Sequence, residues 1–297
     1  MNRKTAAVFI SAAIIFCIIL CCASATAQEK KKDAPAVETI VERSNRVAYY
    51  QGKDGRADVN MSIVDGQGRT RNRQFTILRH DNLPEGKTDQ EEIENFSGDQ
   101  RFYVYFKAPP DVEDTVFMVW KHVELGQDDD RWLYLPDLDL VKRIAASDER
   151  SSFVGSHFFY EDVSGRNTNE DKHELVDVTD QYYVLDSTPK NPDMVEFSHY
   201  KNWIHRETFL PIQTDYYNQR NEVYRRYKVL NVSRPQGFLT VTKSKMSDLR
   251  TGGHTTIEYS DVEYNVGLPK DIFTERYLRK PPRSEEHTSE LQSLLII

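Results

Sequence analysis

Cysteine is scarce in this chain, and the position of its few cysteines excludes several classes of protein. The sequence has 297 residues and three cysteines, Cys17, Cys21 and Cys22, all within the first 27 residues. If that segment is removed, the remaining chain has no thiol, no disulfide and no cysteine metal ligand. It therefore cannot be a cysteine hydrolase or a dithiol redox protein. A chain of this length can bury a core large enough to fold without disulfides.

Motifs of nucleophilic, phosphate and metal chemistry are also missing. The sequence has no Gly-x-Ser-x-Gly elbow and no glycine-rich phosphate loop. Ser156 stands beside His157, but adjacency in sequence does not give the geometry of a catalytic triad. The eight histidines lack ligand spacing, and the acids of Asp128–Asp130 point in diverging directions, which favours a solvated loop over a cation site. We therefore predict no catalytic residue, no metal and no cofactor, and the net charge of −8 argues against nucleic acid as a partner.

Both ends of the chain are set apart from the fold. The basic region Asn2–Lys4, an apolar run over 6–23 and the small residues Ala25 and Ala27 predict a signal peptide, 1–27, cleaved after Ala27. An uncleaved membrane anchor is the alternative. Residues 28–36 are expected to be a disordered lead-in, and 283–297 read as the in-frame translation of a sequencing adapter. One domain is expected over 37–282.

Beyond one helix, the pattern predicts strands and turns. Residues 37–50 place apolar side chains at three- and four-residue steps, as in a helix packed on a sheet. Alternation over 58–63 and 71–78 predicts a hairpin, and the continuously apolar run 115–120 predicts a strand buried on both faces. Further strands are expected at 101–107, 132–135, 141–144, 158–161, 173–179, 182–186, 194–201, 209–217, 222–232, 238–245 and 255–264. The fold class is therefore mainly β, with one antiparallel sheet or barrel.

Two features could carry a function. Glu161 and Asp162, with Asp148 or Glu149 as partner, could form the carboxylate pair of a hydrolase, although adjacent acids at a strand end are common without chemistry. The other feature is a surplus of aromatic residues, 16 Tyr, 14 Phe and 3 Trp, many of them on predicted strands. A curved sheet whose concave face is incompletely filled becomes a pocket for lipid. An ordinary aromatic core would give the same counts.

Residues 131–163 carry a family resemblance. It is found in Trp132–Pro136, Val141–Ile144, Ser152–Ser156 and Phe158 with Tyr160–Asp162, and in the flanking segments 106–109 and 208–211. Here the chain resembles the LolA-like outer-membrane lipoprotein-sorting proteins of Gram-negative bacteria, in their poorly characterised branch. His157 departs from the pattern, which has an acidic residue at this place.

The resemblance implies a half-open antiparallel β-barrel closed by one or a few helices, with a hydrophobic cavity and no covalent chemistry. We accordingly expect a periplasmic carrier or chaperone for lipoprotein acyl chains or another lipid, passing its cargo toward the outer membrane. An inner-membrane transporter or an outer-membrane acceptor is the expected protein partner. The alternatives are an accessory partner of an envelope transporter and, less favoured, an exported hydrolase. The residues expected to line or cover the cavity are Phe102, Tyr105, Val119, Trp132, Tyr134, Phe158 and Tyr160.

Overall fold

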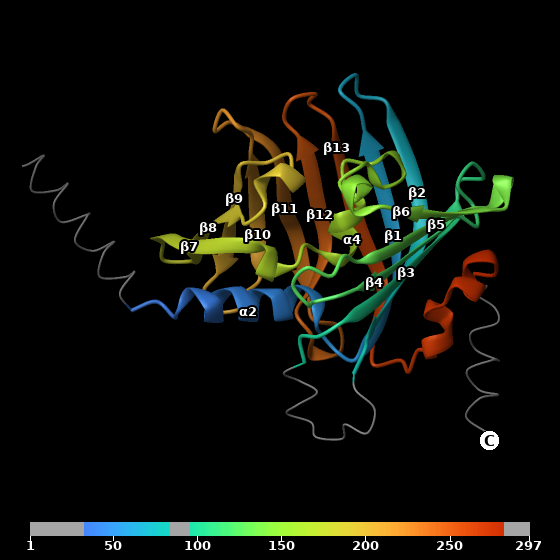
Figure 1. The fold of residues 1–297 in the computed structure, drawn as a ribbon, viewed down its shortest axis with the longest axis horizontal. Coiled ribbons are helices and arrows are strands. Elements are labelled where there is room, and N and C mark those ends of the chain that lie inside the picture. Colours follow the sequence, from blue (N-terminus) through green and yellow to red (C-terminus); the bar gives the residue numbers. More distant parts are fainter. Residues whose placement is uncertain (1–32, 84–95, 282–297) are drawn as a thin grey trace, which may run out of the picture.

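The described residues are built around one large antiparallel sheet (Figure 1). The structure is a computed structural model that describes residues 33–83 and 96–281. Its sheet has thirteen strands in the order β6-β5-β4-β3-β2-β1-β13-β12-β11-β10-β9-β8-β7. The end strands β6 and β7 do not pair with each other, so the curved sheet stays open, as the family resemblance implies. In these ranges no helix has the length and apolar character needed to cross a bilayer.

The elements alternate with short connections. The strands are β1 Asp54–Val64, β2 Thr70–Asp81, β3 Gln100–Ala108, β4 Val116–Lys121, β5 Asp130–Leu135, β6 Leu140–Ile144, β7 Asp171–Val178, β8 Tyr182–Pro189, β9 His199–His205, β10 Pro211–Tyr217, β11 Val223–Ser233, β12 Thr240–Asp248 and β13 His254–Tyr264. The α-helices are α2 Val37–Tyr49 and α4 Tyr160–Ser164. The 3-10 turns are η1 Pro136–Leu138, η2 Ala146–Asp148, η3 Phe153–Gly155, η4 Thr168–Glu170, η5 Pro192–Met194, η6 Pro235–Gly237, η7 Lys270–Phe273 and η8 Glu275–Arg279.

The strand order divides the sheet into two meanders that meet at the pair β1–β13. Strands β1–β6 form the first half and β7–β13 form the second half, and each strand pairs with its neighbours in sequence. Because β6 and β7 are consecutive in the chain but lie at opposite edges, residues 145–170 must cross the whole sheet. We call this segment the crossover. It contains most of the stretch that carries the family resemblance.

Local chemistry sets the central hairpin. Strands β1 and β2 pair without interruption from Asp54↔His80 to Val64↔Thr70. In the turn, the Asp65 carboxylate accepts hydrogen bonds from the backbone N–H groups of Gln67 and Arg69, both at 3.0 Å. Gly68 has φ +81°, a conformation that glycine adopts without strain. The hairpin predicted from the polar–apolar alternation is confirmed.

The sheet is buried on both faces in its first half. Along β3, Phe102, Val104 and Phe106 join a cluster under the crossover, on what we call the inner face. The alternate residues Tyr103 and Tyr105 point to the outer face, because successive side chains of a strand point to opposite sides. The outer face is covered by η7 and η8, where Tyr103 Oη donates to the Tyr277 carbonyl at 2.7 Å and Trp120 Nε1 to the Phe273 carbonyl at 2.8 Å. Both faces of β4 are therefore buried, as its continuous apolar run predicts.

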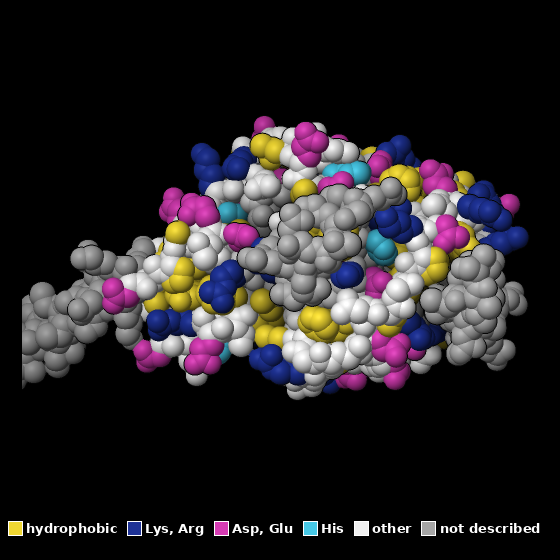
Figure 2. Space-filling view, turned by 90° about the horizontal axis from the view of Figure 1, so that it is seen from below, with side chains coloured by type: hydrophobic (Ala, Val, Ile, Leu, Met, Phe, Trp, Pro, Cys, Tyr) yellow, Lys and Arg dark blue, Asp and Glu magenta, His cyan; other side chains and the backbone are white. Residues whose placement is uncertain are grey.

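Helix α2 covers part of the second half. Its apolar face packs on β7, β8 and β9, with Ile40 fully buried and Val37, Val41 and Val47 beside it. Figure 1 shows α2 lying across the lower side of these strands. The predicted helix is confirmed to within one residue. In Figure 2, which views the molecule from below, basic and acidic side chains are mixed over the visible surface.

Two expected elements differ in the structure. The strand expected at 158–161 is wrong: only Phe159 makes an isolated bridge, to Ser152, and α4 begins at Tyr160. The Asp162 carboxylate accepts the Phe159 N–H at 2.6 Å, which starts a helical turn in place of a strand. Strand β9 begins at His199 and not at residue 194, since Pro192 opens a 3-10 turn. The predicted signal peptide, most of the lead-in and the adapter-like tail lie outside the described residues.

Candidate functional site

A cavity of about 400 Å³ lies between the inner face of the sheet, α2 and the crossover. This volume is within the range of small-molecule binding sites. The lining side chains are mainly apolar residues and tyrosines. Those that the argument uses are Ser44 and Tyr49 of α2, Tyr216, Tyr227 and Tyr259 of the second half of the sheet, and Asp162 of the crossover. A mostly apolar surface with a few polar groups is typical of a ligand site.

The crossover determines where this cavity lies, because it fills the inner face of the first half of the sheet. Phe153 is buried among other rings, with centroids 5.5 Å from Phe117, 5.5 Å from Tyr160 and 5.9 Å from Phe106. The loop behind it turns sharply, with Val154 at φ +46° and Gly155 at φ +75°. A branched residue in the left-handed region is strained, so the surrounding packing must hold it there. The crossover thus covers β4 and part of β3, and the open volume lies beside it, against α2, β1–β3 and β7–β13.

The structure divides the seven predicted cavity residues among three places. Phe102 and Phe158 line the cavity. Val119 and Tyr160 are buried in the core between the crossover and the first half of the sheet. The remaining three, Tyr105, Trp132 and Tyr134, belong to the cluster of the outer face and lie outside the lining of the cavity. The sequence pattern thus identified residues that become buried, but not the element or the face on which each one lies.

Most lining residues were missed from the sequence because they belong to α2 and the second half of the sheet. Tyr49, Tyr216 and Tyr259 line the cavity, and none was singled out. A signal that could have found Tyr216 and Tyr259 is their position on the predicted strands 209–217 and 255–264. The residues predicted for the cavity come instead from segments between residues 101 and 161.

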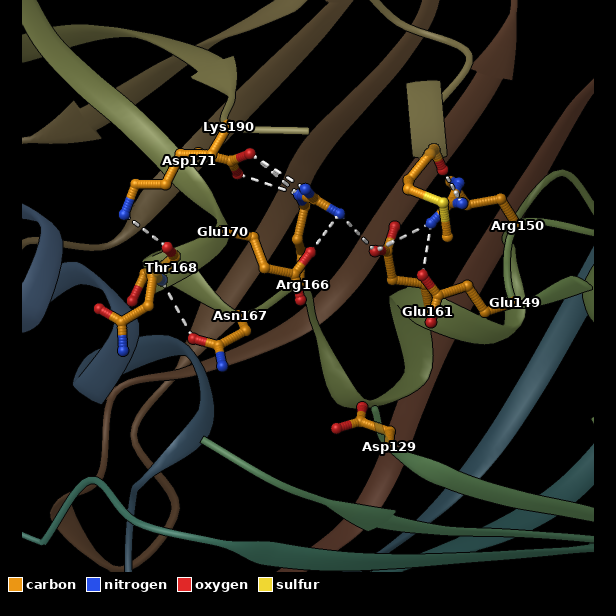
Figure 3. Close-up of polar contacts among 12 residues, drawn as sticks. Asp129, Glu149, Arg150, Glu161, Arg166, Asn167, Thr168, Glu170, Asp171 and Lys190 are labelled. Atoms are coloured by element: carbon orange, nitrogen blue, oxygen red, sulfur yellow. Dashed lines mark hydrogen bonds and ion pairs between the residues drawn. The ribbon is translucent and has the colours of Figure 1, made fainter. Parts of the chain in front are cut away.

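An ionic network fixes the crossover to the sheet (Figure 3). Arg131 of β5 is only 2% exposed and holds Asp129 at 2.8 Å and Glu149 at 2.7 Å. Further along the crossover, Glu161 lies 3.0 Å from Arg166 and 3.7 Å from Arg150. Arg166 also binds Asp171 of β7 at 3.0 Å, so the network runs from β5, next to one edge of the sheet, through the crossover to β7 at the other edge. Breaking one partner of such a buried pair is costly because a desolvated charge is left alone.

Each of the four acids considered for hydrolysis, Asp148, Glu149, Glu161 and Asp162, has a structural environment that explains its presence without a catalytic role. Burial raises the pKa of Glu161 to about 7, with Arg166 as the main opposing influence. Asp162 pairs with the buried Arg225, in addition to its bond from the Phe159 N–H. Glu149 is held by Arg131 and Arg150, and Asp148 is exposed on η2. In the described ranges, no group of three or more His, Cys, Asp or Glu side chains is placed to hold a metal ion.

A buried lysine forms hydrogen bonds with backbone carbonyls at the C-terminal end of α4. Lys121 of β4 donates from Nζ to the carbonyls of Ser164 at 2.7 Å and Gly165 at 3.0 Å. Burial lowers its pKa to about 8. Next to it, Tyr49 of α2 packs so closely on Gly165 that a Cβ there would come within 2.4 Å of the ring. Glycine is therefore required at this position, where α2 meets the crossover.

Comparisons with known proteins agree with this architecture. A family model described as an uncharacterized protein matches residues 98–280, more than half of the chain. A DUF1329 family protein from Desulfovibrio piger is 28% identical, with a TM-score of 0.71, and the match covers 82% of this chain and 100% of that one. No curated protein sequence matches the chain.

Two more distant structures agree in fold. A putative outer membrane lipoprotein-sorting protein domain from Vibrio parahaemolyticus is 23% identical, with a TM-score of 0.68, over 82% of this chain and 98% of that one. A LolA superfamily protein from Nitrosomonas europaea is 17% identical, with a TM-score of 0.61, over 82% of this chain and 100% of that one. The open curved sheet is thus a half-open barrel of the predicted kind. Because the family model matches more than half of the chain, the chain belongs to that family of uncharacterized proteins, and it shares its fold with the LolA superfamily structure.

Proposed function

We propose that this protein is a periplasmic carrier or chaperone that binds a hydrophobic ligand, lipoprotein acyl chains or another lipid, for transfer toward the outer membrane. The observation that carries the proposal is the cavity of about 400 Å³ between α2, the crossover and the inner face of the sheet. Removing an acyl chain from water is worth about 0.8 kcal/mol for each buried CH₂ group. A carrier needs only this noncovalent gain, together with a means of release.

The arrangement of the cover fits such a role. Helix α2 is held on the sheet mainly by the packing of apolar side chains. Its backbone comes close to few other residues, and these are chiefly in β7. The crossover, by contrast, is held by the buried ion pairs of Arg131 and Arg166. We therefore infer that cargo enters and leaves by displacement of α2, while the crossover stays fixed. Elements with few buried contacts open at a lower free-energy cost than those with many.

The test uses the purified, exported protein. Lipids are extracted with organic solvent and identified by mass spectrometry, and a neutral fluorescent probe, phenylnaphthylamine, is titrated into the delipidated protein. We expect co-purified lipid and saturable probe fluorescence that lipid extracts compete away. Protein that carries no lipid and gives no saturable fluorescence would overturn the proposal.

A further inference from the structure

Several tyrosine hydroxyl groups line the cavity without a partner in the protein. Tyr49, Tyr216, Tyr227 and Tyr259 come from α2, β10, β11 and β13 and converge on the same space. Tyr227 bonds to Ser244. Within residues 33–83 and 96–281, the hydroxyls of Tyr49, Tyr216 and Tyr259 have no hydrogen-bond partner. The three side chains are half-buried and line the open volume, so their hydroxyls are available to pair with a molecule that occupies the cavity.

Charges of both signs lie beside these hydroxyls, and each already has a partner. The Arg225 guanidinium lies 5.0 Å from the Tyr216 ring and pairs with Asp162. Lys121 lies 5.1 Å from the Tyr49 ring and donates to two backbone carbonyls. Asp162 lines the cavity and is held by Arg225, whose guanidinium stacks on Phe159 at 3.9 Å. Burial raises the pKa of Tyr49 and of Tyr216 far above the usual value, and the carboxylate of Asp162 adds to the effect at both. Burial likewise raises the pKa of Tyr227 to about 12. The hydroxyls therefore remain neutral, and a carboxylate among them would have to displace Asp162 in order to pair with Arg225.

The arginines that line the cavity already have carboxylate partners. Arg166 binds Asp171 and Glu161, each at 3.0 Å. Arg79 pairs with Asp81 and also donates to the carbonyls of Gln51 and Gly52, at 2.6 and 2.8 Å. Arg56 has longer contacts, 3.7 Å to Asp58 and 3.9 Å to Glu263. An incoming carboxylate would have to compete with these acids for each guanidinium.

We propose that the cavity selects lipids with an uncharged, hydroxyl-bearing head, of the monoacylglycerol type, over the carboxylate of a free fatty acid. This inference rests on the proposed function, because it specifies the class of cargo for the same cavity. The tyrosine hydroxyls pair with the head, and the apolar lining holds the chain. Each neutral hydrogen bond contributes modestly, so two or three of them give a preference of about tenfold.

The experiment compares lipids that have different head groups but the same chain length. Monolauroylglycerol, lauryl alcohol and laurate compete at neutral pH, below their aggregation concentrations, against phenylnaphthylamine bound to the wild-type protein. We expect monolauroylglycerol to bind about tenfold more tightly than laurate. Equal affinities, or tighter binding of laurate through Arg56, would overturn the proposed selectivity but leave the carrier function standing. If no lipid displaces the probe, or the probe does not bind, the carrier function itself fails.

Substitutions assign the preference to the hydroxyls. The triple variant Tyr49→Phe, Tyr216→Phe and Tyr259→Phe keeps the rings and removes the unpartnered groups. The triple variant should bind monolauroylglycerol and laurate with nearly equal affinity, and its affinity for phenylnaphthylamine should stay unchanged. Tyr105→Phe is the matched control, because its buried unpartnered hydroxyl lies on the outer face, and it should keep the wild-type ratio. If the triple variant keeps the wild-type ratio, the tyrosines do not select the head; if it does not fold, the comparison of lipids on the wild type still decides the selectivity.

Discussion

The replacement Glu161→Gln should change how the stability of the fold depends on pH. Burial raises the pKa of Glu161 from its usual 4.5 to about 7, and the carboxyl lies between Arg150 and Arg166 in the network of the crossover. Between these two pH values the folded protein retains a proton that the unfolded chain has lost. The stabilising contribution is therefore complete below about pH 4.5 and is lost as pH rises through about 7. A shift of this size corresponds to about 3 kcal/mol.

The glutamine variant has no proton to lose at this site, so its stability should lack this part of the pH dependence. Asp81, whose pKa burial raises to about 6, gives both proteins a common slope that cancels in the difference. The assay is urea unfolding, followed by circular dichroism, at a series of pH values from about 4.5 to 8. The difference in free energy of unfolding, wild type minus variant, should fall by about 3 kcal/mol across the series. Parallel stability curves would refute the reasoning that burial controls the titration of Glu161.

Three further predictions test the cavity, the crossover on the inner face of the sheet, and the turns η7 and η8 on its outer face. Ser44 is a small buried residue of α2 that lines the cavity, so Ser44→Phe should fill the space and abolish binding of phenylnaphthylamine in a fluorescence titration, whereas Ser44→Ala should bind normally. Phe153→Ala should destabilise the fold by about 3–5 kcal/mol in urea unfolding, because it empties the ring cluster beneath the crossover, while the exposed Val232→Ala should cost less than about 0.5 kcal/mol. Phe273→Ala, in η7 on the outer face, should also lower the free energy of unfolding by about 3–5 kcal/mol in the same assay. The folded variant should bind phenylnaphthylamine as tightly as the wild type. A weakened affinity would contradict the separation of the two faces.

Much of the sheet could be predicted from the sequence because local patterns determine it. The turn at Asp65–Gly68 and the alternation around it give the β1–β2 hairpin, and β4 reads as buried on both faces from its apolar run. Strands β10, β11, β12 and β13 follow the predicted ranges closely, since short turns separate them. Helix α2 could be predicted because its apolar side chains recur every three or four residues, whereas those of the later segments alternate as in strands.

The site could not be predicted to the same degree, because its position depends on contacts between distant segments. Whether a strand residue faces inward or outward is decided by what covers each side, so Tyr105 and Trp132 were grouped with Phe102 although they pack on the outer face. The route of the crossover follows from β6 and β7 lying at opposite edges of the sheet, which no local pattern reveals. The bond from Phe159 N–H to Asp162 likewise changed an expected strand into the start of α4.

A photoactivatable alkyl probe, cross-linked to the wild-type protein and mapped by peptide mass spectrometry, tests the central claim most directly. If the cavity beneath α2 holds the cargo, the label should appear on peptides containing Tyr49, Tyr216 or Tyr259, and Ser44→Phe should suppress it. Labelling concentrated instead around Trp132 and Tyr134 of the outer face, and unaffected by Ser44→Phe, would contradict the account.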